Sequence, residues 1–206
     1  MSAELLHLLE TEDELIASTI RESHGRIGVS NKYGEEFGEY HAQVFELCLK
    51  RCGKAGLVRV MVHNARQGSE SRGTTLELIA TVFDQGFSDE QRDQLSGALV
   101  SGATDTTSAF NRYFAMNGIG RMLQTTLVSP QRREDMHRAV IANVTDPLTD
   151  NRSYAVQTLA KFRDARDRPL LTAIAGNDTA RTVSRGKTVY PVRGAALAAL
   201  EKLPPP

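Results

Sequence analysis

Apolar and small residues recur at helical spacing in the second half of the chain, and the spacing itself recurs about every forty residues. Counted from an arginine, these residues stand at plus three, plus four, plus seven and plus ten, which is one face of an α-helix. The pattern therefore predicts a helical repeat array over 72–203. Four segments share the register: Arg72 with Thr75, Leu76, Ile79 and Val82; Arg112 with Ala115, Met116, Ile119 and Met122; Arg152 with Ala155, Val156, Leu159 and Phe162; and Arg193 with Ala196, Leu197, Leu200 and Leu203.

Helical spacing also covers most of the remaining chain, so the sequence predicts an all-α protein of about eleven helices. Helix starts are marked by the Ser88-x-x-Gln91 capping box and by Ser129 followed by Pro130. The stretch LVRVMVH at 57–63 alternates as a strand would, but we expect a helix there because its neighbours are helical. The expected helices span 4–10, 11–25, 35–52, 57–66, 73–85, 89–101, 107–126, 130–143, 153–165, 169–175 and 191–203.

Repeats and helices together predict a single α-solenoid domain over 1–206. In such an array antiparallel helix pairs stack into a right-handed superhelix, and each pair contacts only its neighbours. We expect 1–68 to form N-terminal helices with a degenerate capping repeat, and 72–203 to form four repeats. Solenoids present extended surfaces to partners, so the architecture indicates binding rather than a particular reaction.

Charge is distributed unevenly, although the net charge is zero. Residues 1–46 carry ten acidic and three basic side chains, which leaves 22 basic and 15 acidic side chains in the remainder. Between Arg152 and Arg193 nine basic residues stand against three acidic ones. The basic half favours an acidic partner. The sequence has no basic leader and no apolar run of roughly 18 residues, so we expect a cytoplasmic protein without membrane contact.

The two cysteines, Cys48 and Cys52, could join His41 and His63 in a zinc site. However, Cys-x-x-x-Cys within one helix lacks the turn that structural zinc sites use. The Cβ atoms of residues four apart on a helix are also about 5–6 Å apart, which is more than a disulfide spans. We therefore expect reduced thiols in the core.

Other motifs for chemistry are incomplete. Glu4-x-x-His7 and Glu134-x-x-His137 have the spacing of a di-iron motif, which requires two further inward glutamates. His137 follows the core position Met136, so we expect it to face solvent. The run Arg185 to Thr188 contains the Gly-Lys-Thr with which a phosphate-binding loop ends. That loop also requires a glycine five residues before this Gly, and the residue there is Arg181. Hydrolase and metalloprotease motifs are absent from the sequence. We expect no catalytic residue, no metal and no cofactor.

The segments RSYAVQTLAKFRDARDRPLLTAI, from Arg152, and VRGAALAALEKL, from Val192, resemble the HEAT-like repeat family. This family includes the repeats of phycobilisome lyases and of many bacterial adaptor proteins. The resemblance implies an aspartate in the turn after each repeat and an arginine that opens the next one. An arginine in the first turn of a helix opposes the macrodipole, so a carboxylate partner in the preceding turn is physically reasonable. The expected pairs are Asp105 with Arg112, Asp146 with Arg152, and Asp178 with Arg193.

An insertion at 179–191 separates the last two repeats. Insertions in solenoids project from one face, which is often the binding face, and an ordinary surface loop is the equal alternative. The basic residues near this end of the chain are the candidate partner-binding residues: Arg163, Arg166, Arg181, Arg185 and Lys187.

Three classes of function remain open. The first is a non-catalytic scaffold that binds a protein with an acidic surface, as bacterial adaptors and toxin-immunity proteins similar to the family do. The second is nucleic-acid binding, as in the HEAT-like alkylpurine DNA glycosylases, which the absence of tryptophan and the zero net charge disfavour. The third is a bilin lyase or chaperone, as in the phycobilisome relatives.

Overall fold

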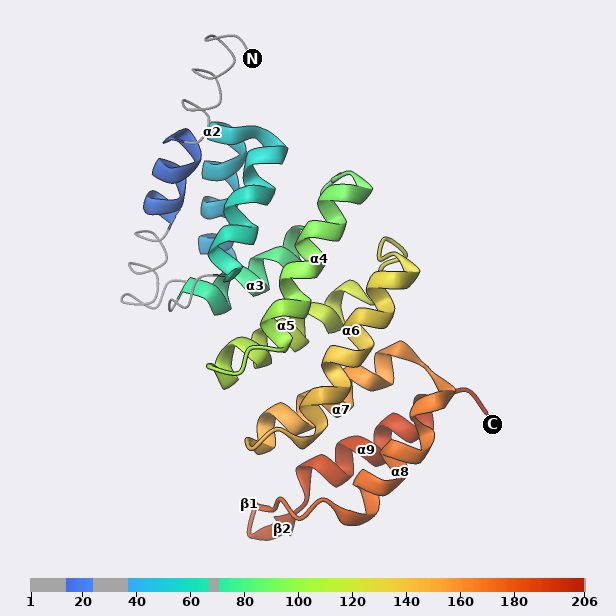
Figure 1. The fold of residues 1–206 in the computed structure, drawn as a ribbon. Helices are drawn as coiled ribbons and strands as arrows, with labels where there is room; N and C mark the ends of the chain where they lie inside the picture. Colours follow the sequence, from blue (N-terminus) through green and yellow to red (C-terminus); the bar gives the residue numbers. More distant parts are fainter. Residues whose placement is uncertain (1–13, 24–36, 67–70, 206) are drawn as a thin grey trace.

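The residues that the structure describes are mostly helical, as expected. A computed structural model describes residues 14–23, 37–66 and 71–205 (Figure 1). These residues form a helix at 14–23 and the further helices α2 Phe37–Arg66, α3 Ser71–Val82, α4 Asp89–Ala103, α5 Ala109–Met122, α6 Pro130–Ala142, α7 Thr149–Phe162, α8 Arg168–Asn177 and α9 Pro191–Lys202, with 3-10 turns at Asn143–Thr145 and Ala165–Asp167. The all-α prediction is confirmed. The helix expected at 4–10, the motif at Glu4 and the Thr11 capping position lie outside the described residues.

The α2 element consists of two helical parts joined at Gly53. This glycine has φ 61° and ψ −172°, which interrupts the helix where the sequence predicted a break between 35–52 and 57–66. Leu57, Val58 and Met61 are fully buried in the second part. The alternating stretch at 57–63 is therefore helical, as expected, and α2 as a whole packs on both α3 and α4.

Helix starts follow the predicted capping residues. Ser88 and Gln91 form a reciprocal capping box at the start of α4. Ser129 accepts a hydrogen bond from the backbone N–H of Arg132, and Pro130 occupies the first turn of α6, where a missing N–H costs nothing.

The helices that carry the arginine register form one layer. In it α3 packs on α5, α5 on α7 and α7 on α9, while α4 and α6 pack together in a second layer (Figure 1). Contacts of α4 with α5, α6 with α7 and α8 with α9 join the layers. From α3 to α7 the helices thus alternate between the two layers along the chain, and the core lies between them.

The predicted register matches the core in α3, α5 and α7. Leu159, for example, is fully buried, as are its counterparts Ile79 and Ile119. In α9 the match fails at Leu197, which is 57% exposed, and Leu200 is only partly buried. The reason is that α9 packs against α7 and α8, whereas Leu197 lies on the side that another repeat covers in the earlier helices.

The insertion between α8 and α9 forms a β-hairpin, which the sequence did not predict. Strands β1 Thr182–Ser184 and β2 Lys187–Val189 pair antiparallel. Arg185 and Gly186 connect them with φ values of 50° and 74°, as a two-residue hairpin turn requires. All residues from 181 to 190 are exposed.

Within the described ranges, none of the helices has the length and apolar character needed to span a membrane.

Candidate partner-binding face

The turns that precede α5, α7 and α9 each place an aspartate in the same set of contacts. One carboxylate oxygen accepts the backbone N–H two residues later: Thr107 donates to Asp105 at 2.8 Å, Leu148 to Asp146 at 2.8 Å and Ala180 to Asp178 at 2.9 Å. The other oxygen accepts an arginine from the preceding helix of the layer: Arg72 reaches Asp105 at 2.7 Å, Arg112 reaches Asp146 at 2.6 Å and Arg152 reaches Asp178 at 2.9 Å. We call these residues, with Arg193, the Arg–Asp ladder.

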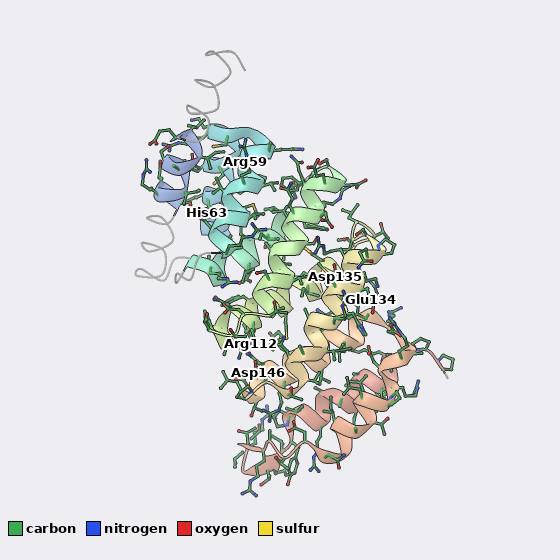
Figure 2. All side chains as sticks on the ribbon, in the orientation of Figure 1. Arg59, His63, Arg112, Glu134, Asp135 and Asp146 are labelled. Carbon is green, nitrogen blue, oxygen red and sulfur yellow. The ribbon has the colours of Figure 1, made fainter. Side chains whose placement is uncertain are left out.

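Each following arginine also contacts the same aspartate, through the main chain. The guanidinium groups donate to the aspartate carbonyl oxygens: Arg112 to Asp105 at 2.8 Å, Arg152 to Asp146 at 2.8 Å and Arg193 to Asp178 at 2.5 Å. Arg112 and Arg152 therefore bridge two successive turns each. Figure 2 shows Arg112 and Asp146 beside each other at one edge of the molecule.

The ladder corrects the expected pairing. The sequence paired the Asp146 carboxylate with Arg152 and the Asp105 carboxylate with Arg112, but both carboxylates bind the arginine one repeat earlier. The physical reason is the direction of each side chain. The arginine that follows an aspartate donates to the main-chain carbonyl of that aspartate, so it does not contact the carboxylate. The preceding arginine points along the stack to the carboxylate. The ladder thus joins neighbouring repeats as well as closing each turn.

Hydrogen bonding keeps the ladder carboxylates ionised. Burial alone would raise the pKa of Asp105, but hydrogen bonds from Thr107 and Asn111 and the charge of Arg72 lower it to about 2. The pKa of Asp146 is lowered in the same way, since bonds from Arg112, Leu148 and Asn151 outweigh its burial. The ladder is a structural element, because each of its carboxylates is already paired with an arginine.

The opposite face of this helix layer carries the candidate binding groups. Because each residue turns the helix by about 100°, the positions two before the register arginine and one, two, five and nine after it lie on the side of the helix opposite the register positions. We call the surface that these positions form on α5, α7 and α9 the outer face. Two groups of side chains on it are candidates for binding, an aromatic cluster and a row of cations, and the exposed Asp150 and Gln157 lie on the same face.

The aromatic cluster consists of Phe110, Tyr113, Phe114 and Tyr154, from α5 and α7. Phe110 and Phe114 meet edge to face with ring centroids 4.6 Å apart, and the Tyr113 hydroxyl donates to that of Tyr154 at 3.0 Å. The hydrogen bond to Tyr154, with burial and the nearby carboxylates of Glu77 and Asp150, raises the pKa of Tyr113 to about 12. Phe110 remains 66% exposed. A large apolar side chain this exposed, beside two others, is typical of a contact surface.

The row of cations consists of Arg121, Lys161 and Lys202. Each stands nine residues after the register arginine of its helix, in α5, α7 and α9. We call it the basic row. Arg121 lies 3.9 Å from the Glu77 carboxylate. Among the described residues no carboxylate lies within salt-bridge distance of Lys161 or Lys202. These residues were not among those predicted from the sequence, although each stands nine positions after a register arginine.

A groove of about 520 Å³ runs between α7 and α9 on the outer face, and it ends at Lys161 and Lys202. The Lys161 side chain crosses over Gly120 of α5, since a Cβ atom added at Gly120 would lie 2.8 Å from its ammonium nitrogen. Burial lowers the pKa of Lys161, and the charges of Lys202 and Arg121 lower it further. The three cations of the row therefore act on one another electrostatically.

The five basic residues predicted to bind a partner do not form one cluster. Arg163 and Arg166 follow α7, where Arg166 binds Asp164 at 2.6 Å and Glu134 at 3.0 Å. Arg181, Arg185 and Lys187 belong to the hairpin segment beyond α8. The ten residues of α8 separate the two groups, a length of about 15 Å. Their role stays a prediction.

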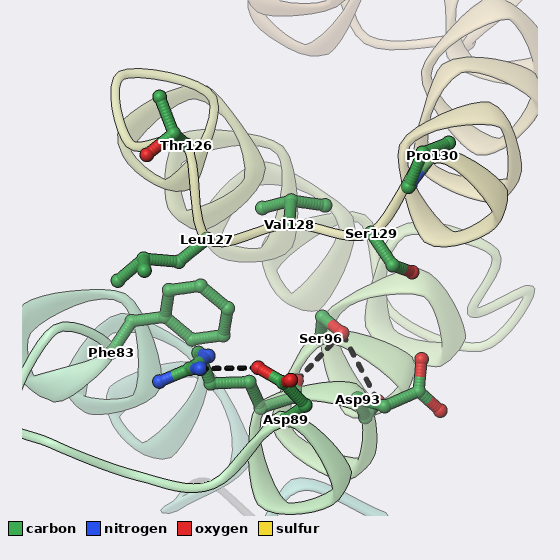
Figure 3. Close-up of a pocket in the computed structure, with 10 residues that line it drawn as sticks. Phe83, Asp89, Asp93, Ser96, Thr126, Leu127, Val128, Ser129 and Pro130 are labelled. Atoms are coloured by element: carbon green, nitrogen blue, oxygen red, sulfur yellow. Dashed lines mark hydrogen bonds and ion pairs between the residues drawn. The ribbon is translucent and has the colours of Figure 1, made fainter.

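A second pocket, of about 340 Å³, lies between the start of α4 and the connection from Thr126 to Pro130 (Figure 3). Phe83 and Leu127 form its apolar side. On its polar side Arg92 contacts the Asp89 carboxylate, and the Ser96 hydroxyl donates to the main chain of α4. These polar groups contact one another rather than converging on an open position, so the pocket is a weaker candidate than the outer face.

His137 is buried, contrary to the expectation that it faces solvent. It is 5% exposed, and its Nε2 lies 2.9 Å from both carboxylate oxygens of Asp167. The 3-10 turn before α8 brings Asp167 over α6, so this side of the helix is covered as well as the side of Met136. Asp167 makes this contact instead of capping α8. Phe162 packs edge to face on the imidazole.

Neither Cys48 nor Cys52 forms a disulfide, and Cys48 is fully buried, as expected. Cys52 is partly exposed, and its sulfur lies 3.4 Å from the Thr19 hydroxyl. In the part of the chain that the structure describes, no three His, Cys, Asp or Glu side chains are grouped as a metal site would require.

Comparison with known proteins gives no further constraint: no family model matches the chain, and no curated protein matches it. The geometry of the ladder and of the outer face is the basis for a function.

Proposed function

We propose that the chain is a right-handed α-solenoid of HEAT-like repeats that binds a protein partner with an acidic surface and catalyses no reaction. The function is that of an adaptor or a toxin-immunity protein. Three features of the described residues support the solenoid: the period of the register arginines, the two layers of helices, and a ladder in which each repeat is bonded to the next. A stack bonded in this way presents its outer face as one rigid surface.

The observation that carries the proposal is the basic row. Arg121, Lys161 and Lys202 are one repeat apart each, and packed helix axes are separated by about 8–10 Å. The row therefore spans roughly 20 Å, the scale of a protein contact surface. Lys161 and Lys202 have no carboxylate partner among the described residues, so an acidic partner would gain two new ion pairs. Electrostatic complementarity of this kind sets the choice of partner and the rate of association.

The aromatic cluster favours a protein over a nucleic acid. Phe and Tyr side chains are enriched at protein interfaces, and stacking on them is also how single-stranded nucleic acids bind. Here, however, Glu77 and Asp150 lie close enough to influence the Tyr113 hydroxyl. Bases stacked on the cluster would bring their phosphates next to these carboxylates, which repel them. A protein can contact the rings without carrying a negative charge at that point.

The proposal is tested by isolating partners at about 150 mM salt, a physiological ionic strength, with and without nuclease. Wild type is compared with Lys161→Glu/Lys202→Glu in the basic row and with Arg181→Glu/Arg185→Glu in the hairpin, which makes the same change of charge elsewhere. We expect the row variant to lose a protein that wild type and the hairpin variant retain.

The other results are equally informative. Loss with the hairpin variant alone would place the contact in the insertion, as the sequence analysis predicted, and would remove the basic row from it. Recovery of nuclease-sensitive material alone, with affinity falling by several powers of the salt concentration, would support nucleic-acid binding. Retention of the same proteins by both variants would exclude both the basic row and the hairpin arginines as the contact and would contradict the proposal as argued from the row.

A further inference from the structure

The α7–α9 groove combines a floor of small side chains with cations at one end. Lys161 and Lys202 stand at the end where both helices finish. Along the rest of the groove the side chains are small or short and polar, and none is aromatic: Ser153, Gln157, Ala160, Pro191, Ala195, Ala198 and Ala199. A floor of alanines lets a polypeptide backbone approach the helices closely, whereas it offers no ring on which a base could stack.

The polar groups of the groove suit a peptide backbone. Gln157 donates from its amide nitrogen to the Ser153 hydroxyl at 3.2 Å, and both side chains lie on the α7 wall. The amide oxygen of Gln157 and the second hydrogen of its amide nitrogen are left for a backbone N–H and C=O. Eight residues separate Ser153 from Lys161, which is about 12 Å of helix and the length of about four residues of extended chain.

The geometry points to the α7–α9 groove as the binding site for an extended acidic polypeptide segment, whose carboxylates contact Lys161 and Lys202 while its small side chains lie along Ala195 and Ala198. This inference rests on the proposed function and identifies both the site and the chemistry of the partner's contacting segment. Charge complementarity identifies the occupant, because two lysines without a carboxylate partner among the described residues meet at one end of a groove.

The electrostatics of Lys161 support the same occupant. Its ammonium lies over Gly120 and shares its surroundings with Lys202 and Arg121. Two positive charges held near each other raise the free energy of the empty groove, and a carboxylate between them removes that repulsion. Lysines in the last turn of a helix also interact favourably with the macrodipole. The macrodipole would explain a lysine at the end of each helix, but not why the two lysines share one groove. The experiment below separates this structural role of the lysines from a role in binding a peptide.

The test uses the full chain and a fluorescently labelled peptide of roughly eight residues, two adjacent glutamates among alanines. The same peptide with glutamines and a short oligothymidylate are the comparison probes, and fluorescence anisotropy gives the affinities. Two variants change the groove: Lys161→Ala/Lys202→Ala removes its charges, and Ala198→Phe fills it from an exposed helix position. Arg181→Ala/Arg185→Ala removes the same number of charges from the hairpin.

We expect the glutamate peptide to bind wild type and the hairpin variant with similar affinity. Both groove variants should bind it at least about tenfold more weakly, a change of about 1.4 kcal/mol, and the glutamine peptide should bind weakly throughout. Circular dichroism melts show whether each variant is folded. Equal binding by the lysine variant and wild type, or equal binding of the two peptides, would overturn the inference. Binding of oligothymidylate alone would overturn it too and would favour nucleic acid.

Failure of this inference can be distinguished from failure of the proposed function. If the isolated partner is lost with Arg121→Glu but retained with Ala198→Phe, the outer face binds the partner and the groove does not. If neither substitution affects the partner, neither the basic row nor the groove binds it, so the inference is wrong and the proposed function loses the observation that carries it.

Discussion

The Arg112 guanidinium and the Asp146 carboxylate are 34 residues apart in the chain and 2.6 Å apart in the fold. The contact joins α5 to the turn that precedes α7, and its counterparts join α3 to the next turn and α7 to the last. Helix packing holds neighbouring helices together. The ladder adds a fixed contact between each helix and the turn before the next helix of the layer, which sets the position of one helix relative to the next. The outer face depends on that displacement, because the basic row is aligned only if successive helices keep the same register.

Removing one partner of the Arg112–Asp146 pair should destabilise the fold. The Asp146 side chain is 2% exposed, so Arg112→Gln leaves a buried carboxylate without its main counter-charge, which costs about 3–5 kcal/mol. A double-mutant cycle of Arg112→Gln with Asp146→Asn, measured by urea denaturation, should show favourable coupling of about 1–3 kcal/mol.

Arg152→Gln is the matched control for this cycle. Arg152 contacts Asp146 through the backbone carbonyl, which Asp146→Asn leaves in place. Its coupling to Asp146→Asn should therefore be much smaller than that of Arg112. Stronger coupling to Arg152 would contradict the ladder and restore the pairing that the sequence suggested.

Acid should weaken the fold through the ladder. The pKa of Asp105 is about 2 in the folded chain and 3.8 in its unperturbed state, so between these values the unfolded chain binds more protons. The stability from this ionisation is complete above about pH 4 and is lost as the pH falls towards about 2. Asp105→Asn should be less stable at neutral pH and should lose less stability on acidification. Denaturation series at several pH values measure both, with the exposed Asp84→Asn as control. Parallel pH profiles for wild type and Asp105→Asn would contradict this assignment.

Much of the helical layer could be predicted from the sequence because helix packing imposes a period. Positions three, four, seven and ten after each arginine are buried in α3, α5 and α7, and Ser88, Ser129 and Gly53 mark boundaries by local chemistry. Leu197 was predicted wrongly because the same position has a different neighbour in α9. The hairpin was missed because its strands are three residues long and have no buried side to produce an alternating pattern.

The candidate site was harder to predict because it depends on contacts between repeats. The ladder partners were assigned by closeness in sequence, whereas Arg112 reaches along the stack to Asp146. His137 was placed in solvent because its own helix is only one of the two elements that surround it, and Asp167 belongs to the other. The basic row follows the same period as the core, so it was present in the sequence. Its exposure and its shared groove are properties of the fold.

Truncation of Leu159 should unfold the C-terminal repeats early. Leu159 is fully buried between the layers, and replacing a buried leucine by alanine usually costs about 2–5 kcal/mol. Leu197→Ala removes the same atoms from a position that is 57% exposed in α9 and should change stability by about 0.5 kcal/mol or less. Thermal melts followed by circular dichroism compare the two. Equal melting temperatures would mean that the register does not define the core.

Two helical glycines, Gly102 in α4 and Gly120 in α5, should respond in opposite ways to alanine. A Cβ atom at Gly102 would lie 2.8 Å and 2.9 Å from the two terminal carbons of Leu76, inside the packed core. Overpacking of this kind costs about 1–3 kcal/mol, which exceeds the helix-propensity gain of about 1 kcal/mol. Gly102→Ala should therefore melt at a lower temperature than wild type. A higher melting temperature would show that the core relaxes around the added methyl group.

Gly120→Ala should instead alter binding without loss of stability. Its Cβ atom would meet only the end of the Lys161 side chain, at 2.8 Å from the ammonium nitrogen, and a flexible side chain can move aside. The fold should be unchanged or up to about 1 kcal/mol more stable, because alanine favours a helix over glycine. The displaced ammonium should bind the glutamate peptide several-fold more weakly, although every charge is retained. Urea denaturation and fluorescence anisotropy on the same sample separate the two effects. Unchanged affinity would mean that the position of Lys161 over α5 does not contribute to the groove, and lower stability would mean that Gly120 belongs to the core.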